Sequence, residues 1–141
     1  MKKSLKNTLV MLIPIGILIG VTSLSLMPPD KLPSTRGWFT DIPHGDKIIH
    51  FGFYFCLITA IRFARTYTKG YSKSCPWILI SFAALYGGAI EILQGAYFGR
   101  GCDIWDEIAN ILGAIIAIWI IPQRWHERIA VKFGRESADK P

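Results

Sequence analysis

Side chains capable of acid–base or binding chemistry gather in three short clusters that interrupt apolar stretches of the chain. The clusters are Asp46, Lys47 and His50; Glu91 and Gln94; and Arg100, Asp103, Asp106 and Asn110. Within them, His50, Glu91 and Asp106 carry groups that could act as catalytic acids or bases. The other six side chains offer charges and amides for ligand binding. Ionisable groups flanked by apolar segments are costly in lipid unless they face protein or a wet cavity, so we expect the clusters to share one site.

The chain that carries these clusters is too apolar for an ordinary soluble domain of its size. Of its 141 residues, 51% are hydrophobic and 18% are charged. A membrane-spanning helix needs about 20 mostly apolar residues, and residues 9–27, 48–64, 77–97 and 103–121 fit that rule. We therefore expect an all-α membrane protein, in which residues 1–141 form one domain, a four-transmembrane-helix bundle without a separate soluble catalytic domain.

The distribution of basic residues predicts how the bundle is oriented. Twelve of the 16 Lys and Arg residues lie in the N-terminal segment, between Arg62 and Lys73 at and after the end of the second apolar segment, or in the C-terminal tail. The positive-inside rule then places both termini in the cytoplasm and all three polar clusters on the outer side of the membrane. The basic residues are dispersed and suit anionic headgroups, so membrane lipids are expected partners and nucleic acid is not.

Both ends of the chain allow two interpretations. The first apolar segment could be a secretory signal, but its run of 19 residues is longer than a usual signal core, so we expect it to be retained. In the tail, Trp125, Ile129 and Phe133 recur at helical spacing beside basic residues. This pattern predicts a helix at the inner membrane surface, with a disordered end as the alternative.

Helical spacing predicts that each polar cluster shares a face with residues deeper in its segment. The predicted faces are Asp46, His50 and Phe53; Ala84, Gly88, Glu91 and Gln94; and Asp103, Asp106, Asn110, Gly113 and Ala117. Small residues in two of these stripes permit close helix contact, so both stripes are expected to turn toward protein. Glu107, next to Asp106, is expected to point elsewhere.

Some of the polar residues also have a simpler explanation. Asp46 and Asp103 stand where helices begin, and a carboxylate there caps backbone N–H groups and meets the helix dipole favourably. For Asp103 taken alone, capping is the favoured interpretation. Glu91 lies near the end of its segment, where a negative charge opposes the dipole, so it needs a partner such as Arg100, Lys47 or protonated His50, or must hold a proton.

The order and spacing of these clusters resemble the VanZ-like family of small bacterial integral membrane proteins. The resemblance rests on RGCDIWDEIANILG at residues 100–113, EILQ at 91–94 and DKIIHF at 46–51. It implies a multi-pass protein of the bacterial cytoplasmic (inner) membrane. The family's namesake is associated with resistance to teicoplanin, a lipid-tailed glycopeptide that acts outside that membrane. The resemblance does not supply a settled biochemical activity, and any cofactor is left unknown.

Three functions remain open. In the first, an outward polar site recognises an envelope lipid or lipoglycopeptide, with Lys47 and Arg100 at an anionic headgroup and Gln94 and Asn110 as hydrogen-bonding groups. In the second, the protein is a membrane hydrolase or transferase acting on a lipid, with His50 as base or acid. In the third, the ion pairs only clamp the helices together. No GxSxG, HExxH or P-loop motif appears. A divalent metal could be ligated by His50, Glu91, Asp103 and Asp106, but nothing in their spacing requires one, so no metal is expected.

Overall fold

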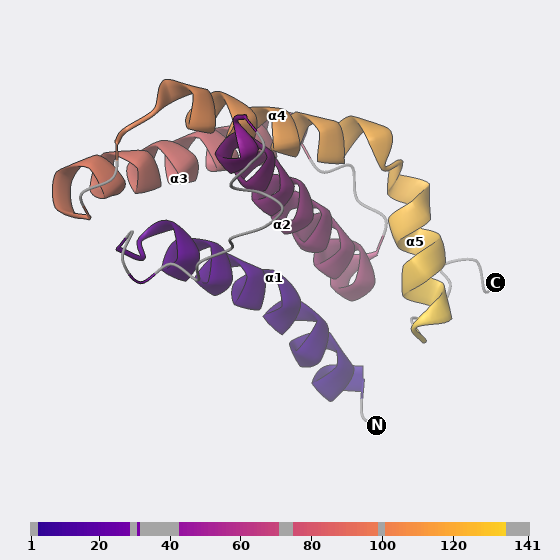
Figure 1. Cartoon of the computed structure of the whole chain (residues 1–141). Coiled ribbons are helices and arrows are strands. Elements are labelled where there is room, and N and C mark those ends of the chain that lie inside the picture. Colours follow the sequence, from indigo (N-terminus) through magenta and orange to yellow (C-terminus); the bar gives the residue numbers. More distant parts are fainter. Residues whose placement is uncertain (1–2, 29–30, 32–42, 71–74, 99–100, 135–141) are drawn as a thin grey trace.

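The computed structural model describes residues 3–28, 31, 43–70, 75–98 and 101–134, and all regular structure in these ranges is helical. The helices are α1 (Lys3–Ser25), α2 (Gly45–Lys69), α3 (Pro76–Tyr97), α4 (Ile104–Ile120) and α5 (Gln123–Lys132) (Figure 1). The predicted all-α fold is confirmed. Helices α1, α2 and α3 are long and apolar enough to cross a membrane, and α4 joins them if it is taken with α5, from which a 73° bend separates it.

Helix α2 is longer than the predicted segment 48–64 at both ends. It begins at Gly45, after His44 in the left-handed region, and continues to Lys69. At Gly70, with φ 87°, the backbone leaves the helical region while its N–H still donates to the Thr66 carbonyl. The polar pair at the start and the basic residues at the end are therefore part of the helix itself.

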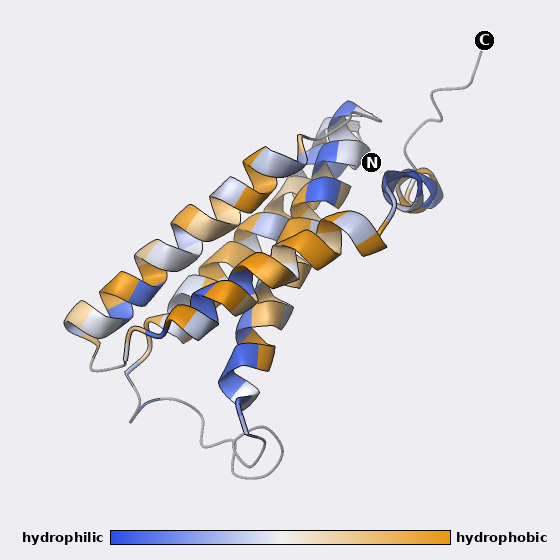
Figure 2. Cartoon of the chain, turned by 90° about the horizontal axis from the view of Figure 1, so that it is seen from above, coloured by the Kyte–Doolittle hydropathy of each residue, from blue (hydrophilic) through white to orange (hydrophobic). Residues whose placement is uncertain are grey.

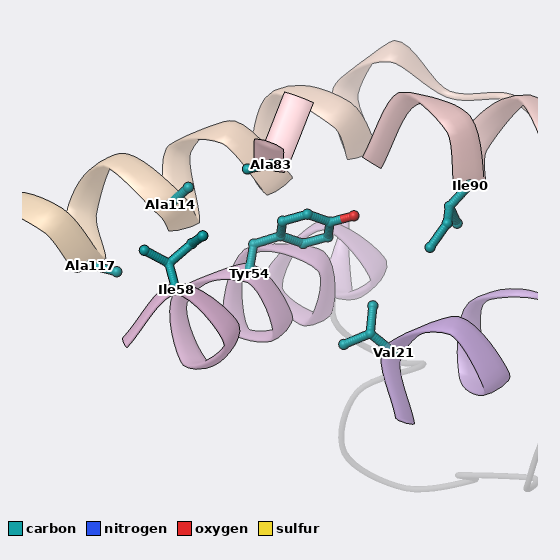
Figure 3. Close-up of a cluster of buried hydrophobic side chains, with 7 residues drawn as sticks. All are labelled: Val21, Tyr54, Ile58, Ala83, Ile90, Ala114 and Ala117. Atoms are coloured by element: carbon teal, nitrogen blue, oxygen red, sulfur yellow. The ribbon is translucent and has the colours of Figure 1, made fainter. Parts of the chain in front are cut away.

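Small residues bring α2 and α4 into direct backbone contact. A Cβ atom at Gly113 would collide with the carbonyl oxygen of Phe51 and would lie 3.1 Å from the backbone nitrogen of Phe55. One turn further on, Ala117 is fully buried, and it belongs to the same apolar cluster as Ile58 (Figure 3). The predicted inward stripe of α4 is confirmed, because its close packing requires residues without large side chains.

The predicted small-residue stripe of α3 was displaced by one position. Ala83 and Gly87 are buried, and Gly88 has no atoms of other segments within 4 Å of where its Cβ would be. The inward face continues through Glu91 and Gln94, as predicted. Residues three and four positions before Glu91 fit helical spacing equally well, so the sequence alone did not select Gly87 over Gly88.

Helix α1 is held to α3 by polar contacts near its C-terminal end. The Thr22 and Tyr86 hydroxyls lie 2.5 Å apart, and Tyr86 also donates to the Leu18 carbonyl at 3.3 Å. At Gly16 and Gly20, by contrast, an added Cβ would meet nothing within 4 Å. These two positions of α1 are not covered by another helix in the described part of the chain.

A buried arginine terminates α4. Arg62 of α2, 5% exposed, donates through Nη1 to the carbonyls of Ala117 and Ile121, and through Nη2 to Oε1 of Gln123 at 3.1 Å. The last carbonyls of a helix have no hydrogen-bond partner within it. The guanidinium donates to these carbonyls of α4, which would otherwise lack a partner at the bend before α5. From the sequence, Arg62 had been counted only among the basic residues after the second segment.

Apolar residues predominate along the long helices (Figure 2), and many of them are exposed on the outside of the bundle. Leu85 is 77% exposed, Trp119 is 72% exposed and Trp77 is 71% exposed, values that suit contact with lipid chains. The predicted tail helix is confirmed as α5, in which Trp125 and Ile129 are exposed and His126 is buried. Its position at the membrane surface stays a prediction.

Candidate functional site

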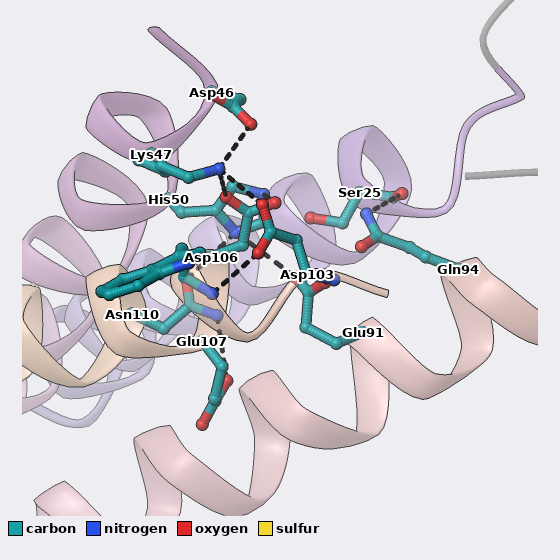
Figure 4. A network of polar contacts seen from close by, with 11 residues as sticks. Ser25, Asp46, Lys47, His50, Glu91, Gln94, Asp103, Asp106, Glu107 and Asn110 are labelled. Carbon is teal, nitrogen blue, oxygen red and sulfur yellow. Dashed lines mark hydrogen bonds and ion pairs between the residues drawn. The ribbon is translucent and has the colours of Figure 1, made fainter. Parts of the chain in front are cut away.

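The ammonium of Lys47 lies among three carboxylates at one end of the bundle (Figure 4). Its Nζ donates to Oδ2 of Asp46 at 3.0 Å, to Oδ2 of Asp103 at 2.7 Å and to Oδ1 of Asp106 at 3.0 Å. Asp46 and Lys47 are in the first turn of α2, and the other two residues begin α4. An ammonium has three donors, and here each has a carboxylate acceptor. We call these four residues the Lys47 cluster.

Beneath the Lys47 cluster lies a buried set built around His50. Its Nδ1 is 3.1 Å from Oδ1 of Asn110 and 3.7 Å from Oε1 of Glu91, and its Nε2 is 3.8 Å from Oδ2 of Asp106. All four residues are less than 9% exposed. Because an amide oxygen only accepts, the contact with Asn110 assigns the proton to Nδ1 of His50. Asp106 contacts both Lys47 and His50, and so joins the two layers.

Asp103 has both of the roles that the sequence suggested. Its Oδ1 accepts from the N–H of Trp105 at 2.9 Å, which makes it the N-cap of α4. Its Oδ2 binds Lys47, and its own N–H points to Oε2 of Glu91 at 3.4 Å. The start of α4 is therefore fixed to α2 through a side chain and to α3 through the backbone.

Glu107 belongs to the site, although it was expected to point elsewhere. Its Oε2 accepts from Nδ2 of Asn110 at 3.2 Å, and the same oxygen lies close to Gly87 of α3. A Cβ at Gly87 would collide with this carboxylate oxygen and would lie 3.1 Å from the hydroxyl of Tyr54, a side chain that is 1% exposed. The spacing of three residues between Glu107 and Asn110 was the available signal. Tyr54 gave none, because it looks like any aromatic core residue.

Of the two remaining predicted site residues, one makes a different contact and the other is not described. Gln94 is buried, but its Nε2 donates to the carbonyl of Ser25 at 2.7 Å, so it ties α3 to the end of α1. Figure 4 shows this contact beside the Lys47 cluster. Arg100 lies outside the described residues. The structure therefore brings together seven of the nine predicted residues, which are Asp46, Lys47, His50, Glu91, Asp103, Asp106 and Asn110.

In each of two groups of these side chains, the ligand atoms lie close enough together to hold a metal ion. In His50, Glu91 and Asp106 the candidate atoms lie within 4.8 Å of one another, and the same holds for Asp46, Asp103 and Asp106. The ammonium of Lys47 already lies between the carboxylates of the second group. An imidazole with two carboxylates, as in the first group, suits a divalent ion such as Zn²⁺ or Mn²⁺. The sequence-based expectation of no metal remains untested.

Long helices with apolar outer faces, joined at one end by a buried ionic site, define a helical membrane protein with a polar site inside the bundle. The VanZ/LLP1 family matches residues 3–126 of the chain. The chain therefore belongs to that family, and the resemblance noted in the polar clusters is confirmed. Comparison with curated proteins gave no match, and comparison with solved structures gave none either.

Proposed function

We propose that the Lys47 cluster recognises the headgroup of an envelope lipid or a lipid-tailed glycopeptide at the outer face of the bacterial cytoplasmic membrane. The observation that carries the proposal is a gradient of exposure through the site. The side chain of Asp46 is 51% exposed and that of Asp103 is 38% exposed, while Asp106 is 11% exposed and Glu91 is 3% exposed. A clamp without a ligand needs only one or two buried pairs, whereas this arrangement presents charged oxygens at an accessible rim.

The geometry supports a headgroup that carries a protonated amine. All three donors of Lys47 are used by carboxylates, so this residue is poorly placed to take the anionic group that the sequence assigned to it. Five carboxylates of the described site, those of Asp46, Glu91, Asp103, Asp106 and Glu107, accompany a single lysine. Rim carboxylates favour a ligand with N–H donors, because charge-assisted hydrogen bonds are stronger than neutral ones.

A lipid-binding experiment tests this assignment. The protein in nanodiscs of phosphatidylcholine would be titrated with phosphatidylethanolamine, since both headgroups are zwitterionic but only the second has N–H donors. We expect a preference for phosphatidylethanolamine that falls about tenfold in the double variant Asp46→Asn with Asp103→Asn, from the loss of charge-assisted bonds. Glu127→Gln, in α5, is the control. Equal binding of the two lipids by wild type would contradict an amine-recognising rim.

A cell-based experiment tests the link to teicoplanin. Glu91→Gln, Asp106→Asn and His50→Ala would be expressed separately, with membrane accumulation and teicoplanin susceptibility measured together. We expect normal accumulation with altered susceptibility in at least the Asp106 variant, which joins the rim to the buried layer. Loss of accumulation in every variant would favour the structural clamp instead.

A membrane hydrolase or transferase is the second candidate, and the surroundings of His50 favour it. With Nδ1 assigned as a donor to Asn110, Nε2 faces a buried carboxylate of Asp106, an arrangement that can hold or move a proton. The test is turnover of purified envelope lipids followed by mass spectrometry. Conversion by wild type that His50→Ala abolishes would support an enzyme. No conversion of any envelope lipid by wild type would count against one.

A further inference from the structure

A second candidate binding site lies away from the Lys47 cluster, in a groove between α1, α2 and α3. Its volume is about 500 Å³, within the range of small-molecule and lipid sites. The lining residues come from the middle of α1, the C-terminal half of α2 and one position of α3. They include the apolar Ile15, Leu57 and Ile61 and the polar Arg65, Thr68 and Lys69.

The groove separates its polar and apolar groups along its length. Arg65, Thr68 and Lys69 all belong to the last turns of α2, and both basic side chains are exposed. The rest of the lining is aliphatic or aromatic. A site with apolar walls and cationic groups at one end matches an amphiphile with an anionic head and a hydrocarbon chain.

The packing of α1 explains why this groove stays open. The polar contacts described between α1 and α3 involve Leu18, Thr22 and Ser25 of α1, which lie toward its C-terminal end. The groove starts beside Leu18 and runs along α1 to Met11, away from Thr22 and Ser25. Between residues 11 and 17 of α1, no described hydrogen bond leads to α3, so the space between the helices is left for another occupant.

We propose that this groove holds an acyl chain of an anionic phospholipid whose phosphate lies at Arg65 and Lys69. The chain lies along Ile15, Leu57 and Ile61, and the headgroup lies in the leaflet next to the C-terminal end of α2. By the positive-inside rule that leaflet is the cytoplasmic one. Basic pockets between membrane helices bind anionic headgroups in the same way. The proposal is independent of the function proposed for the Lys47 cluster.

Native mass spectrometry of the full chain released from nanodiscs tests the proposal. The nanodiscs would contain equal amounts of phosphatidylglycerol and phosphatidylcholine. We expect wild type to retain phosphatidylglycerol selectively, and Arg65→Gln with Lys69→Gln to reduce that selectivity about tenfold. Ile61→Trp, which places an indole in the groove, should remove retained lipid of both kinds. Wild type that retains no lipid, or retains both lipids equally, would overturn the proposal.

Matched controls separate this site from general lipid contact. Arg124→Gln with Arg128→Gln removes two basic residues of α5, and Leu85→Trp adds an indole on the exposed face of α3. Neither variant should change retention, and an equal loss in them would overturn the assignment. A second copy of the chain covering the groove would appear as a lipid-free dimer, which also overturns it.

Photo-crosslinking of wild type keeps the proposal testable if Ile61→Trp fails to fold. Phosphatidylglycerol with a diazirine near the end of one chain would be incorporated into the nanodiscs and the adducts mapped by peptide mass spectrometry. We expect adducts concentrated on the lining residues of α1 and α2. Adducts spread evenly over exposed positions such as Leu85 and Trp119 would indicate bulk lipid only and would overturn the proposal.

Discussion

Lys47 Nζ lies 2.7 Å from Oδ2 of Asp103, and this pair joins the first turn of α2 to the N-cap of α4. The same ammonium contacts Asp46 and Asp106, so one positive charge separates three negative ones. The relative positions of the first turns of α2 and α4 therefore depend on one lysine. The same residue holds the candidate site together and stabilises the fold.

Removing that charge should destabilise the protein. Lys47→Met leaves three carboxylates close together, and like charges at such distances repel. We expect the melting temperature in detergent to fall by roughly 5 °C or more, and Asp103→Asn in the same chain to recover part of the loss. Lys69→Met is the matched control. An unchanged melting temperature for Lys47→Met would show that the cluster contributes little to stability.

Two glycine substitutions should distinguish the tight from the open helix faces. At Gly113 an added methyl group meets backbone atoms of Phe51 and Phe55, which cannot move as a flexible side chain could. We expect Gly113→Ala to cost roughly 1–3 kcal/mol of stability, as overpacking does. Gly88→Ala, at an open helical position, should be neutral or stabilising by up to about 1 kcal/mol. Thermal unfolding of both variants measures the difference, and similar results would refute the close α2–α4 contact.

Arg62→Leu should loosen the junction between α4 and α5. Without the guanidinium, the carbonyls of Ala117 and Ile121 lose their partner, at roughly 1–3 kcal/mol for each buried group left unsatisfied. Faster hydrogen exchange in α5 should accompany the loss of stability. Lys69→Leu, two turns away on the same helix and exposed, serves as the control. Unchanged exchange in the Arg62 variant would show that another interaction maintains the bend.

His126 should make stability depend on pH. Burial and the neighbouring positive charge of Arg62 lower the pKa of His126 to about 4. Its ordinary pKa is near 6.5, so between those values the unfolded chain binds a proton that the folded protein does not. Stability should therefore fall as pH decreases from 6.5 to about 4. Melting temperatures across this window should decrease less in His126→Gln than in wild type, and parallel curves would contradict the assignment.

Parts of the fold and of the site were predictable because the spacing of residue types along the sequence indicates them. The stripe of Asn110, Gly113 and Ala117 follows helical spacing, and the close contact with α2 confirms it. The signal was ambiguous in α3, where Gly87 and Gly88 both fit the spacing from Glu91. Periodicity defines a face to within a residue, and only the position of the neighbouring helix decides which residue is covered.

Other site features have no counterpart in the sequence pattern. Arg62 and Gln94 both bind main-chain carbonyls, those of Ala117 and Ser25 among them, and a carbonyl belongs to every residue. The three partners of Lys47 were recognisable as charged residues, but spacing along separate helices cannot say which carboxylate meets which amine. These pairings depend on how the helices cross, which is a property of tertiary packing.

The unequal attachment of the helices has a consequence for how a ligand could enter the bundle. Backbone contact at Gly113 makes α2 and α4 a unit that cannot slide without a steric clash. Helix α1 is held to α3 near its end by the hydroxyl pair of Thr22 and Tyr86 and by the amide of Gln94. Among the described residues, helix α1 packs on α2 through side chains, without a backbone contact of the kind at Gly113. An opening movement should therefore part α1 from α2 rather than α2 from α4, and would admit molecules sideways from the bilayer.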